Sequence, residues 1–417
     1  MVRAEIITIG DEILYGQILD TNTQWISLEL DKIGIKTVRK SSVGDQRDEI
    51  VQILREAQKR ADIVFITGGL GPTKDDLTKK ILADFFNCSL AYHPDALQDV
   101  TDFFAKRGRE LSDINRDQAL LPTKCTFIPN KQGTAPAMWF NEQETIWVSM
   151  PGVPFEMKAI METEVLPRIT THFKLPVIVH QIRKVVGIGE SYLSDLIQDW
   201  ELQLPSHLKL AYLPSLGIVK LRLTGFGQDK VQLQAEIEAE FEKVMPLIKT
   251  YIFGQEKDEL ASVVGQLLVD QQATLAVAES CTGGYLAHQF TQYPGCSAYF
   301  QGGIISYAND VKVKQLGVSQ AILDSDGAVS DSCVMAMAAG VRKHLGTTFA
   351  LATSGIAGPD GGTEEKPVGT IWIALAHPKG VIVRKLTQGG TRMQNIHLSS
   401  LTAINLLRRY LLNDLAE

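Results

Sequence analysis

The residues best suited to chemistry lie in the segment 279–284, which reads Glu-Ser-Cys-Thr-Gly-Gly. The apolar run at 274–278 predicts a buried strand before it, and residues 285–290 predict a helix after it. A turn between a strand and a helix exposes the first amide groups of the helix, and glycine lets an anion or a carbonyl oxygen approach the backbone. Ser280 is therefore either a nucleophile or, like Thr282, a helix cap, and these six residues alone favour the cap.

A nucleophilic serine needs a base, and the sequence offers a lysine rather than a histidine. The eight histidines are dispersed, and a G-x-S-x-G elbow around Ser354 is excluded because Ala352 stands at its first glycine. Lys312 lies five residues after Tyr307, at the start of a predicted helix. Burial lowers the pKa of a lysine and can leave it neutral at working pH, so that it can act as a base. The alternative is a surface lysine, as most lysines are.

Small polar residues also end other predicted strands in the last third of the chain. Ser354 ends the predicted strand at 349–354, and the glycine-rich loop 355–367 follows it. Strands are also predicted at 302–307, which ends at Tyr307, and at 381–386, which precedes the turn that carries Arg392. Because strand ends converge in an α/β sheet, we expect Ser280, Tyr307, Ser354 and Arg392 to form one site.

The first third of the chain alternates strands and helices. Strands are predicted at 4–9, 35–43 and 62–67, with helices at 25–33 and 48–60 between them. Such an alternation is typical of a parallel α/β sheet covered by helices on both faces. The continuous apolar strand at 62–67 agrees with a sheet that is buried on both sides.

Glycines and acids follow two of these strands, at 10–12 and 68–76. Glycines let phosphate oxygens approach the backbone, and carboxylates bind divalent cations, so the pattern favours a metal-assisted phosphate site. The predicted metal ligands are Asp11, Glu12, Asp75 and Asp76. The predicted substrate-binding residues of this region are Gly10, Asn22, Gly68, Gly69, Gly71, Pro72 and Thr73.

Two alternatives remain for these loops. The segment 68–76 can be a tight turn in which Asp75 or Asp76 only caps the next helix. A Walker loop is excluded because the GxxxxGK[ST] spacing is absent. The loop 150–157, after a predicted strand at 145–149, is either the second wall of the site or a rigid turn.

Composition excludes several classes of protein. The net charge of −7 argues against a chain that coats nucleic acid, because the phosphate backbone demands a basic face. The five cysteines are scattered and odd in number, which indicates reduced thiols rather than a disulfide framework. We find no signal peptide and no apolar run near the ~20 residues that span a bilayer. We therefore expect a soluble, cytoplasmic protein without a membrane partner.

The length and the pattern together predict three domains, at 1–170, 171–253 and 254–417. The middle one reads as a small α+β domain without clustered chemistry, so a connecting or dimer-forming role is expected. A GxxG-type RNA-binding loop is disfavoured there because Gly187 and Gly189 lack the spacing and the lysines.

Specific motifs closely resemble the CinA family of competence/damage-inducible proteins over nearly the whole chain. In the C-terminal third they are ESCTGG at 279–284, YANDVK at 307–312, SGIAGPDGGTEEKPVGT at 354–370 and GGTR at 389–392. In the N-terminal third they are GDEILYGQILDTN at 10–22, ITGGLGPTKDDLT at 66–78 and MPGVPFEM at 150–157, and GIGES at 187–191 is similar to the middle segment of the family.

The resemblance implies two activities. The C-terminal domain of this family hydrolyses the carboxamide of nicotinamide mononucleotide without a cofactor, and the N-terminal domain resembles molybdopterin-binding domains with a metal-dependent ADP-ribose pyrophosphatase activity. It implies Ser280 as nucleophile and Lys312 as base, with Tyr307, Ser354 and Arg392 at the other catalytic positions. The substrate-binding positions implied for this domain are Cys281, Thr282, Gly283, Gly284 and Gly355. The family often has threonine where Ser354 stands, which keeps the hydroxyl.

Two functions of different class remain open. One is a bifunctional enzyme of pyridine-nucleotide salvage, with nicotinamide mononucleotide and ADP-ribose as ligands, a divalent metal for the N-terminal domain, and a homodimeric state. The other is a competence-associated protein that binds a partner protein, with a nucleotide- or molybdopterin-binding first domain. The acidic net charge disfavours direct contact with nucleic acid in either case.

Overall fold

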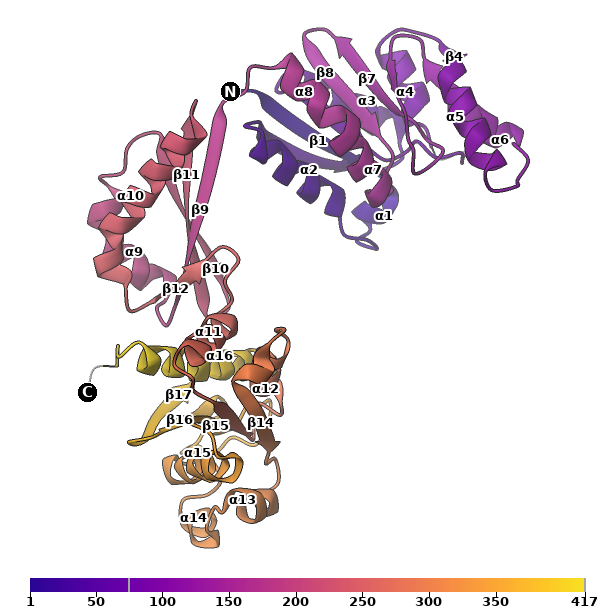
Figure 1. The fold of residues 1–417 in the computed structure, drawn as a ribbon. Helices are drawn as coiled ribbons and strands as arrows, with labels where there is room; N and C mark the ends of the chain where they lie inside the picture. Colours follow the sequence, from indigo (N-terminus) through magenta and orange to yellow (C-terminus); the bar gives the residue numbers. More distant parts are fainter. Residues whose placement is uncertain (74–75, 416–417) are drawn as a thin grey trace. The chain divides into compact units, whose positions relative to one another are not determined.

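The computed structural model describes residues 1–73 and 76–415 (Figure 1). The chain divides into two compact units, and each is described by itself below. The first comprises residues 1–179 and 226–233, and the second comprises residues 180–225 and those from 234 onward. Within the described ranges, no helix is both long enough and apolar enough to cross a membrane.

The first unit is built on a six-stranded sheet with the order β2-β1-β3-β8-β7-β6. The parallel strands are β1 (Arg3–Ile9), β2 (Lys36–Val43), β3 (Ile63–Thr67) and β8 (Thr145–Met150). The antiparallel strands β7 (Ala137–Glu142) and β6 (Thr126–Ile128) complete the sheet. The predicted parallel α/β core is confirmed, whereas the antiparallel edge was not predicted because its strands do not alternate with helices along the chain.

Helices cover both faces of this sheet. One face packs against α2 (Thr21–Lys32), α7 (Pro154–Ile160) and α8 (Leu166–His172), and the other against α3 (Arg47–Gln58) and α4 (Thr78–Phe85). Successive strand residues point to opposite faces, so Ile6 and Ile7 of β1 belong to the two different cores. The shorter elements are α1 (Asp11–Leu14), β4 (Leu90–Tyr92), α5 (Pro94–Ala105), α6 (Asp113–Arg116) and β5 (Leu120–Pro122), with a 3-10 turn at Asp117–Ala119 and a π-helical turn at Met161–Val165.

The middle region forms a four-stranded sheet with the order β10-β11-β9-β12. Its strands are β9 (Val177–Val186), β10 (Leu208–Ser215), β11 (Ile218–Gly227) and β12 (Ile252–Gln255), and its helices are α9 (Glu190–Glu201) and α10 (Lys230–Ile248). The small α+β fold that the sequence predicts for this region is confirmed.

The C-terminal region is a three-layer α/β structure around a sheet with the order β14-β13-β15-β16-β17. The strands are β13 (Leu275–Glu279), β14 (Phe300–Ile305), β15 (Phe349–Gly355), β16 (Thr370–His377) and β17 (Gly380–Thr387). The first three are parallel, and β16 and β17 are antiparallel. The helices are α11 (Leu260–Asp270), α12 (Tyr285–Thr291), α13 (Asn309–Leu316), α14 (Gln320–Ser325), α15 (Asp331–Leu345) and α16 (Arg392–Leu411), with a 3-10 turn at Cys296–Ala298.

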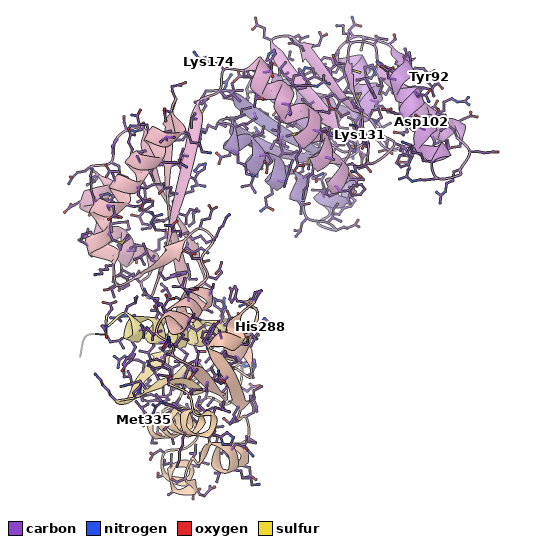
Figure 2. The ribbon with its side chains drawn as sticks, viewed as in Figure 1. Tyr92, Asp102, Lys131, Lys174, His288 and Met335 are labelled. Carbon is purple, nitrogen blue, oxygen red and sulfur yellow. The ribbon has the colours of Figure 1, made fainter. Side chains whose placement is uncertain are left out.

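Helix α15 covers one face of this sheet, and α11, α12 and α16 cover the other. Figure 2 marks the two faces by Met335 on α15 and His288 on α12. The core on the α16 side also includes Val186 and Phe253 of the middle region. The buried guanidinium of Arg408 donates hydrogen bonds of 2.6 Å to the carbonyls of both Thr250 and Ile252. The middle and C-terminal regions are thus joined by apolar and polar contacts.

Candidate functional site

Three adjacent parallel strands of the C-terminal sheet end at the same edge, in the order β14, β13, β15. Ser280 follows β13, Tyr307 lies two residues beyond β14, and Ser354 lies near the end of β15. The sheet pairing continues into the site, because the Ser280 amide donates to Thr353 O at 3.0 Å. The expected convergence of these strand ends is therefore present in the fold.

Lys312 of α13 reaches this edge and contacts Ser280. Its Nζ lies 3.2 Å from Ser280 Oγ, 2.7 Å from the carbonyl oxygen of Ser306 and 3.3 Å from that of Tyr307. The side chain is fully buried, with 1% of Lys312 exposed, so the surface-lysine alternative is wrong. The carbonyls of Ser306 and Tyr307 hold the amine in place, beside the hydroxyl of Ser280.

The environment of Lys312 disfavours its charged form. Burial lowers its pKa below the ordinary lysine value, and only the thiols of Cys333 and Cys281 act in the opposite direction. Lys312 forms no ion pair with a carboxylate among the described residues. A lysine without a counter-ion in a buried site is suited to take up a proton.

The neighbouring thiol does not compete with the hydroxyl. Burial raises the pKa of Cys281 to about 12, so the thiol stays protonated at neutral pH. Thr282 is also buried, and its hydroxyl shares a 2.7 Å hydrogen bond with Thr353. Ser280 is thus the hydroxyl of this turn that contacts the amine.

Glu279 is a residue of the site that the sequence reasoning missed. Its buried carboxylate accepts hydrogen bonds from the amides of Gly284 at 2.9 Å, Leu286 at 3.0 Å and Ala287 at 2.7 Å. It therefore caps α12, the role that the sequence offered to Ser280 or Thr282. A signal was present, because a carboxylate before the first helical turn satisfies free amides and the helix dipole.

This cap decides which amides of the turn can bind a ligand. The Gly284 amide donates to Glu279, and the Gly283 amide donates to Ser280 O at 3.2 Å. The amides of Cys281 and Thr282 donate to no backbone carbonyl in the part of the chain that the structure describes. Two free donors beside a candidate nucleophile match the requirement for holding an oxyanion.

Arg392 and Tyr307 form the exposed side of the site. The guanidinium of Arg392 donates to Gly358 O at 2.7 Å and to the Tyr307 hydroxyl at 3.1 Å. Tyr307 is 62% exposed, and Lys312 meets its backbone carbonyl rather than its ring. A cation and a phenol at the rim suit the binding of an anionic group of a ligand.

Ser354 and Gly355 lie deeper. The Ser354 hydroxyl donates to Ala328 O at 2.6 Å and so fixes the segment before α15. A Cβ on Gly355 would lie 2.7 Å from the Cα of Ile371, so only glycine fits at the start of the long loop. Both residues belong to the same sheet edge, and their observed contacts are to the surrounding backbone.

The second candidate site is a cavity of about 990 Å³ in the first unit. Its walls are the loops after β1, β3 and β8, which are neighbouring parallel strands. The predicted ligands that line it are Gly10, Asp11, Glu12, Asn22, Gly68, Gly69, Gly71, Pro72, Thr73 and Asp76. Asp75 lies outside the described residues. The loop 150–157 also contributes to the wall, so the reading of that loop as a rigid turn alone is insufficient.

Carboxylates gather on one side of this cavity. The amide of Asp11 donates to the Asp45 carboxylate at 3.2 Å, and the amide of Asp45 donates to that of Asp11 at 3.4 Å. Burial, and then the negative charges of Asp11, Glu12 and Asp76, raise the pKa of Asp45. Repulsion of this kind is relieved by a bound cation, so the donor set fits a divalent metal. Within the described ranges, however, no three such side chains converge closely enough to form a complete metal-binding group.

The glycine-rich turn of this cavity is fixed by close backbone approaches. Gly68 and Gly69 have φ values of 112° and 64°, and a Cβ would lie 2.1 Å from Ile9 O and from Thr78 Oγ1 respectively. Asp76 accepts hydrogen bonds from the amide and the hydroxyl of Thr73, at 2.9 and 2.6 Å. These contacts fix the Asp76 carboxylate in the turn that lines the cavity, and Asp76 does not cap α4, whose N-cap residue is Leu77.

Asn22 carries an unsatisfied acceptor in the same wall. Its Nδ2 donates to Thr67 Oγ1 at 3.1 Å and to Gly152 O at 2.8 Å, which ties α2 to β3 and to the loop after β8. Its Oδ1 is buried and has no partner among the described residues. A buried acceptor in a cavity wall is suited to a hydrogen bond from a ligand. The nearby Asp20 is instead used structurally, because it accepts from Thr8 and caps α2 through Thr23.

Two further acids of the cavity were not predicted as ligands. Asp45 follows β2, so the rule that found the acids after β1 would have found it too. Glu156 lies in the first turn of α7, the helix after β8, accepts a 2.6 Å hydrogen bond from Asn130, and has its pKa raised by burial. Both lie at the strand ends that the sequence had already indicated.

Comparisons with known proteins agree with this division of the chain. Residues 5–171 match the model of a probable molybdopterin binding domain, residues 180–254 the damage-inducible protein CinA KH domain, and residues 257–411 the CinA C-terminal domain. A CinA-like protein of Cytophaga hutchinsonii is 52% identical over 410 residues, 98% of each chain. The chain belongs to the CinA family. A CinA-like protein of Flavobacterium psychrophilum is 43% identical over the full length of both chains.

Membership of the CinA family supports a CinA-type function in general, without naming a substrate. Among solved structures, the competence/damage inducible protein CihA from Agrobacterium tumefaciens has 35% sequence identity and a TM-score of 0.35. That alignment covers 36% of this chain and 92% of the other.

The middle region has a relationship that the sequence analysis recognised only in part. GIGES was related to the middle segment of the family, but the match to a KH domain model was not expected, because a GxxG-type RNA-binding loop was disfavoured. That loop reads Gly-Ile-Gly-Glu, with Glu190 where a GxxG loop ends in glycine. The domain is thus related to KH domains, while its loop departs from the RNA-binding pattern.

Proposed function

We propose that the C-terminal region hydrolyses the carboxamide of nicotinamide mononucleotide to nicotinate mononucleotide and ammonia. The observation that carries this proposal is the buried amine of Lys312, 3.2 Å from Ser280 Oγ and without a carboxylate partner among the described residues. A hydroxyl beside a neutral lysine is a known arrangement for nucleophilic attack on an amide. The resemblance to the CinA family supplies the substrate.

The reaction then needs one group that acts first as base and later as acid. Lys312 takes the proton of Ser280 as its Oγ attacks the carboxamide carbon, and the carbonyl oxygen becomes negative. The amides of Cys281 and Thr282 are the free donors for that oxygen. Lys312 then gives the proton to the amide nitrogen, which departs as ammonia. The acyl group remains bound to Ser280 as an ester, the acyl-enzyme. Water cleaves the acyl ester, with Lys312 accepting its proton and returning it to Ser280.

Arg392 is the proposed partner of the phosphate of the nucleotide. Its guanidinium lies at the exposed rim beside the Tyr307 hydroxyl, where a charged phosphate can remain partly solvated. Arginine binds phosphate through paired charge-assisted hydrogen bonds. Recognition by Arg392 would distinguish the mononucleotide from the riboside, which has the same pyridinium ring and no phosphate.

The test is ammonia release by purified full-length protein incubated with nicotinamide mononucleotide, with the product identified by mass. Wild type should release one ammonia for each nicotinate mononucleotide, and Ser280→Ala should release none while still binding the nucleotide. Absence of ammonia from wild type would reject this function and favour the partner-binding alternative. Turnover by Ser280→Ala would point to direct attack by water.

We infer a second activity, hydrolysis of the pyrophosphate of ADP-ribose, for the cavity of the first unit. The specific observation in its favour is the combination of clustered carboxylates with the unsatisfied Asn22 Oδ1 in one wall. Asp11, Glu12 and Asp76, with Asp45 beside them, would bind a divalent cation together with the phosphate oxygens of the substrate, because no three of these side chains converge in the described structure. Asn22 Oδ1 would accept from a ribose hydroxyl. When bound, the cation polarises the scissile phosphate and favours attack by water. The glycines at 68–71 let the phosphates approach the backbone.

This second activity is tested separately. Full-length protein is incubated with ADP-ribose and Mg²⁺ or Mn²⁺, with and without chelator, and AMP and ribose phosphate are measured. Cleavage that survives chelator would show that the metal role is wrong. Ammonia release from nicotinamide mononucleotide in the same samples shows whether the protein is intact.

A further inference from the structure

The first turn of α16 is held to two loops of the C-terminal site. The helix begins at Arg392, and the Thr391 and Gln394 side chains cap it reciprocally. Arg392 itself donates to Gly358 O in the long loop that follows β15. The position of the guanidinium therefore depends on how the turn before α16 and the long loop are fixed against each other.

One buried side chain makes that connection. Asn395 is 0% exposed, and its Nδ2 donates at 3.0 Å to both Ala357 O and Gly390 O. Its Oδ1 accepts from the Gly390 amide at 3.2 Å. Asn395 thus forms hydrogen bonds with the amide and the carbonyl of Gly390 and with the carbonyl of Ala357. Arg392 contacts the next carbonyl along that loop, that of Gly358.

The surroundings leave this arrangement little freedom. A Cβ on Gly390 would lie 2.9 Å from the Cβ of Gln394 and 3.2 Å from Asn395 Oδ1. Gly390 is two residues before Arg392 in the chain, so a displaced Gly390 peptide moves the start of α16. The interior of a protein transmits such shifts because it is closely packed.

We propose that Asn395 is a positioning residue that presents Arg392 to the phosphate of the substrate. The inference rests on the proposed deamidase function for the identity of the substrate, but the binding role can be measured without turnover. Asn395 does not itself touch the nucleotide. Its effect should therefore be selective for ligands that carry the phosphate.

The test compares nicotinamide mononucleotide with nicotinamide riboside, which has the same amide and no phosphate. Binding is measured by calorimetry in full-length Ser280→Ala protein, and KM and kcat are measured in the otherwise wild-type protein. Asn395→Ala should weaken mononucleotide binding and raise its KM roughly ten- to hundredfold, the scale of a lost charge-assisted contact. Riboside affinity and kcat should change far less. Arg392→Ala removes the guanidinium itself, so its loss of mononucleotide affinity is the largest that Asn395→Ala should reach.

A second variant and a matched control guard against simple unfolding. Gly390→Ala should produce the same selective loss, because it displaces the same peptide without altering Asn395. Asn405→Ala removes another buried asparagine of α16, whose Oδ1 accepts from Arg408 at 2.9 Å, and should preserve the preference for phosphate. Both asparagine variants are checked for an unchanged unfolding transition.

The outcomes separate this inference from the proposed reaction. A wild type that binds the mononucleotide but releases no ammonia rejects the deamidase, while loss of phosphate preference in Asn395→Ala still supports the positioning role. Equal losses for mononucleotide and riboside would mean that Asn395 is only structural and would overturn the inference. Failure of Ser280→Ala to prefer the mononucleotide over the riboside would overturn it too.

Discussion

The first unit and the C-terminal region place their candidate sites at the same topological position but equip it with different ionisable groups. In each, three neighbouring parallel strands end at one edge of a sheet that continues with antiparallel strands. The edge of the first unit carries Asp11, Asp45 and Asp76 around a cavity of about 990 Å³. The edge of the C-terminal region carries one buried lysine without a counter-ion among the described residues.

The comparison teaches that the topology of the sheet determines where a site can form. The burial and charge of the side chains there determine which reaction the site can carry out. Clustered carboxylates in an open cavity repel one another and attract a cation, which suits phosphate chemistry. A lone buried amine loses its proton more easily, which suits proton transfer to and from an amide. The same sheet edge can therefore serve two unrelated reactions in one chain.

The largest expected loss of activity follows from removing the nucleophile or the base of the C-terminal site. Ser280→Ala, Lys312→Ala and Lys312→Arg should each lower deamidation by about a thousandfold or more, because hydroxyl and base act as one unit. Arginine keeps the charge but does not release its proton at working pH. Ammonia release is the measurement, and ADP-ribose cleavage should remain at the wild-type rate.

Two matched controls lie nearby in the chain. Lys314→Ala removes an exposed lysine of the same helix, which pairs with Asp310 at 2.9 Å. Ser325→Ala removes a hydroxyl that donates to Ala321 O within α14. Both should keep full activity. A Lys312→Arg protein that retains substantial turnover would contradict the base role of Lys312.

The second-largest expected loss of activity concerns the cavity of the first unit. Asp76→Ala should lower ADP-ribose cleavage roughly a hundredfold, since it removes a proposed cation ligand whose carboxylate the Thr73 contacts hold in place. Deamidation should be unaffected. Asp95→Ala, in the first turn of α5, is the control for a change of charge in the same unit. If both activities fall together, the two sites are not independent.

The sequence could predict the strand ends because apolar runs followed by glycine and polar residues are local signals. It therefore gave the positions of Ser280, Tyr307, Ser354 and the glycine loop at 68–76. Lys312 could be suspected from spacing, but its burial depends on the packing of α13 against α15 and on its place at the sheet edge, which no local pattern encodes.

Residues that act through backbone contacts were beyond the sequence argument. Asn395 is identified as part of the site only by the backbone groups that it holds, one of which lies on another loop. Glu279 holds amides at the start of the next helix, so its local signal was present but was not used. The KH relationship of the middle region was missed for a similar reason. Its loop lacks the usual glycine at position 190, whereas the relationship resides in the domain as a whole.

The two regions should also respond differently to pH. Deamidation needs neutral Lys312, so its rate should fall about tenfold per pH unit below the pKa of that amine. Burial lowers this pKa, which moves the acid limb below the ordinary lysine range of about 10. ADP-ribose cleavage needs ionised carboxylates, and it should be lost only at lower pH, near the raised pKa of Asp45.

The measurement is the pH profile of kcat/KM for both substrates in one preparation. Deamidation should disappear first as the pH is lowered, and cleavage of ADP-ribose second. The reverse order, or a deamidase rate that does not depend on pH across the neutral range and above, would contradict a titrating lysine base.

The smallest effect concerns the cap that holds the nucleophile turn. Glu279→Gln replaces a carboxylate that accepts from the amides of Gly284, Leu286 and Ala287, and the new amide group must turn a donor toward at least one of them. We expect a stability loss of about 1–3 kcal/mol. Because Ser280 is the next residue, we also expect kcat to fall roughly tenfold, about 1.4 kcal/mol of transition-state stabilisation.

The control is Glu240→Gln, a buried carboxylate of the same unit whose partner is Lys243 at 2.6 Å. It can lower stability, but it should leave kcat unchanged because it lies on α10 in the middle region. Chemical unfolding and ammonia release are measured for both variants. A Glu279→Gln protein with reduced stability and a wild-type kcat would show that the carboxylate only caps α12. Ser280 would then be placed by strand β13 alone.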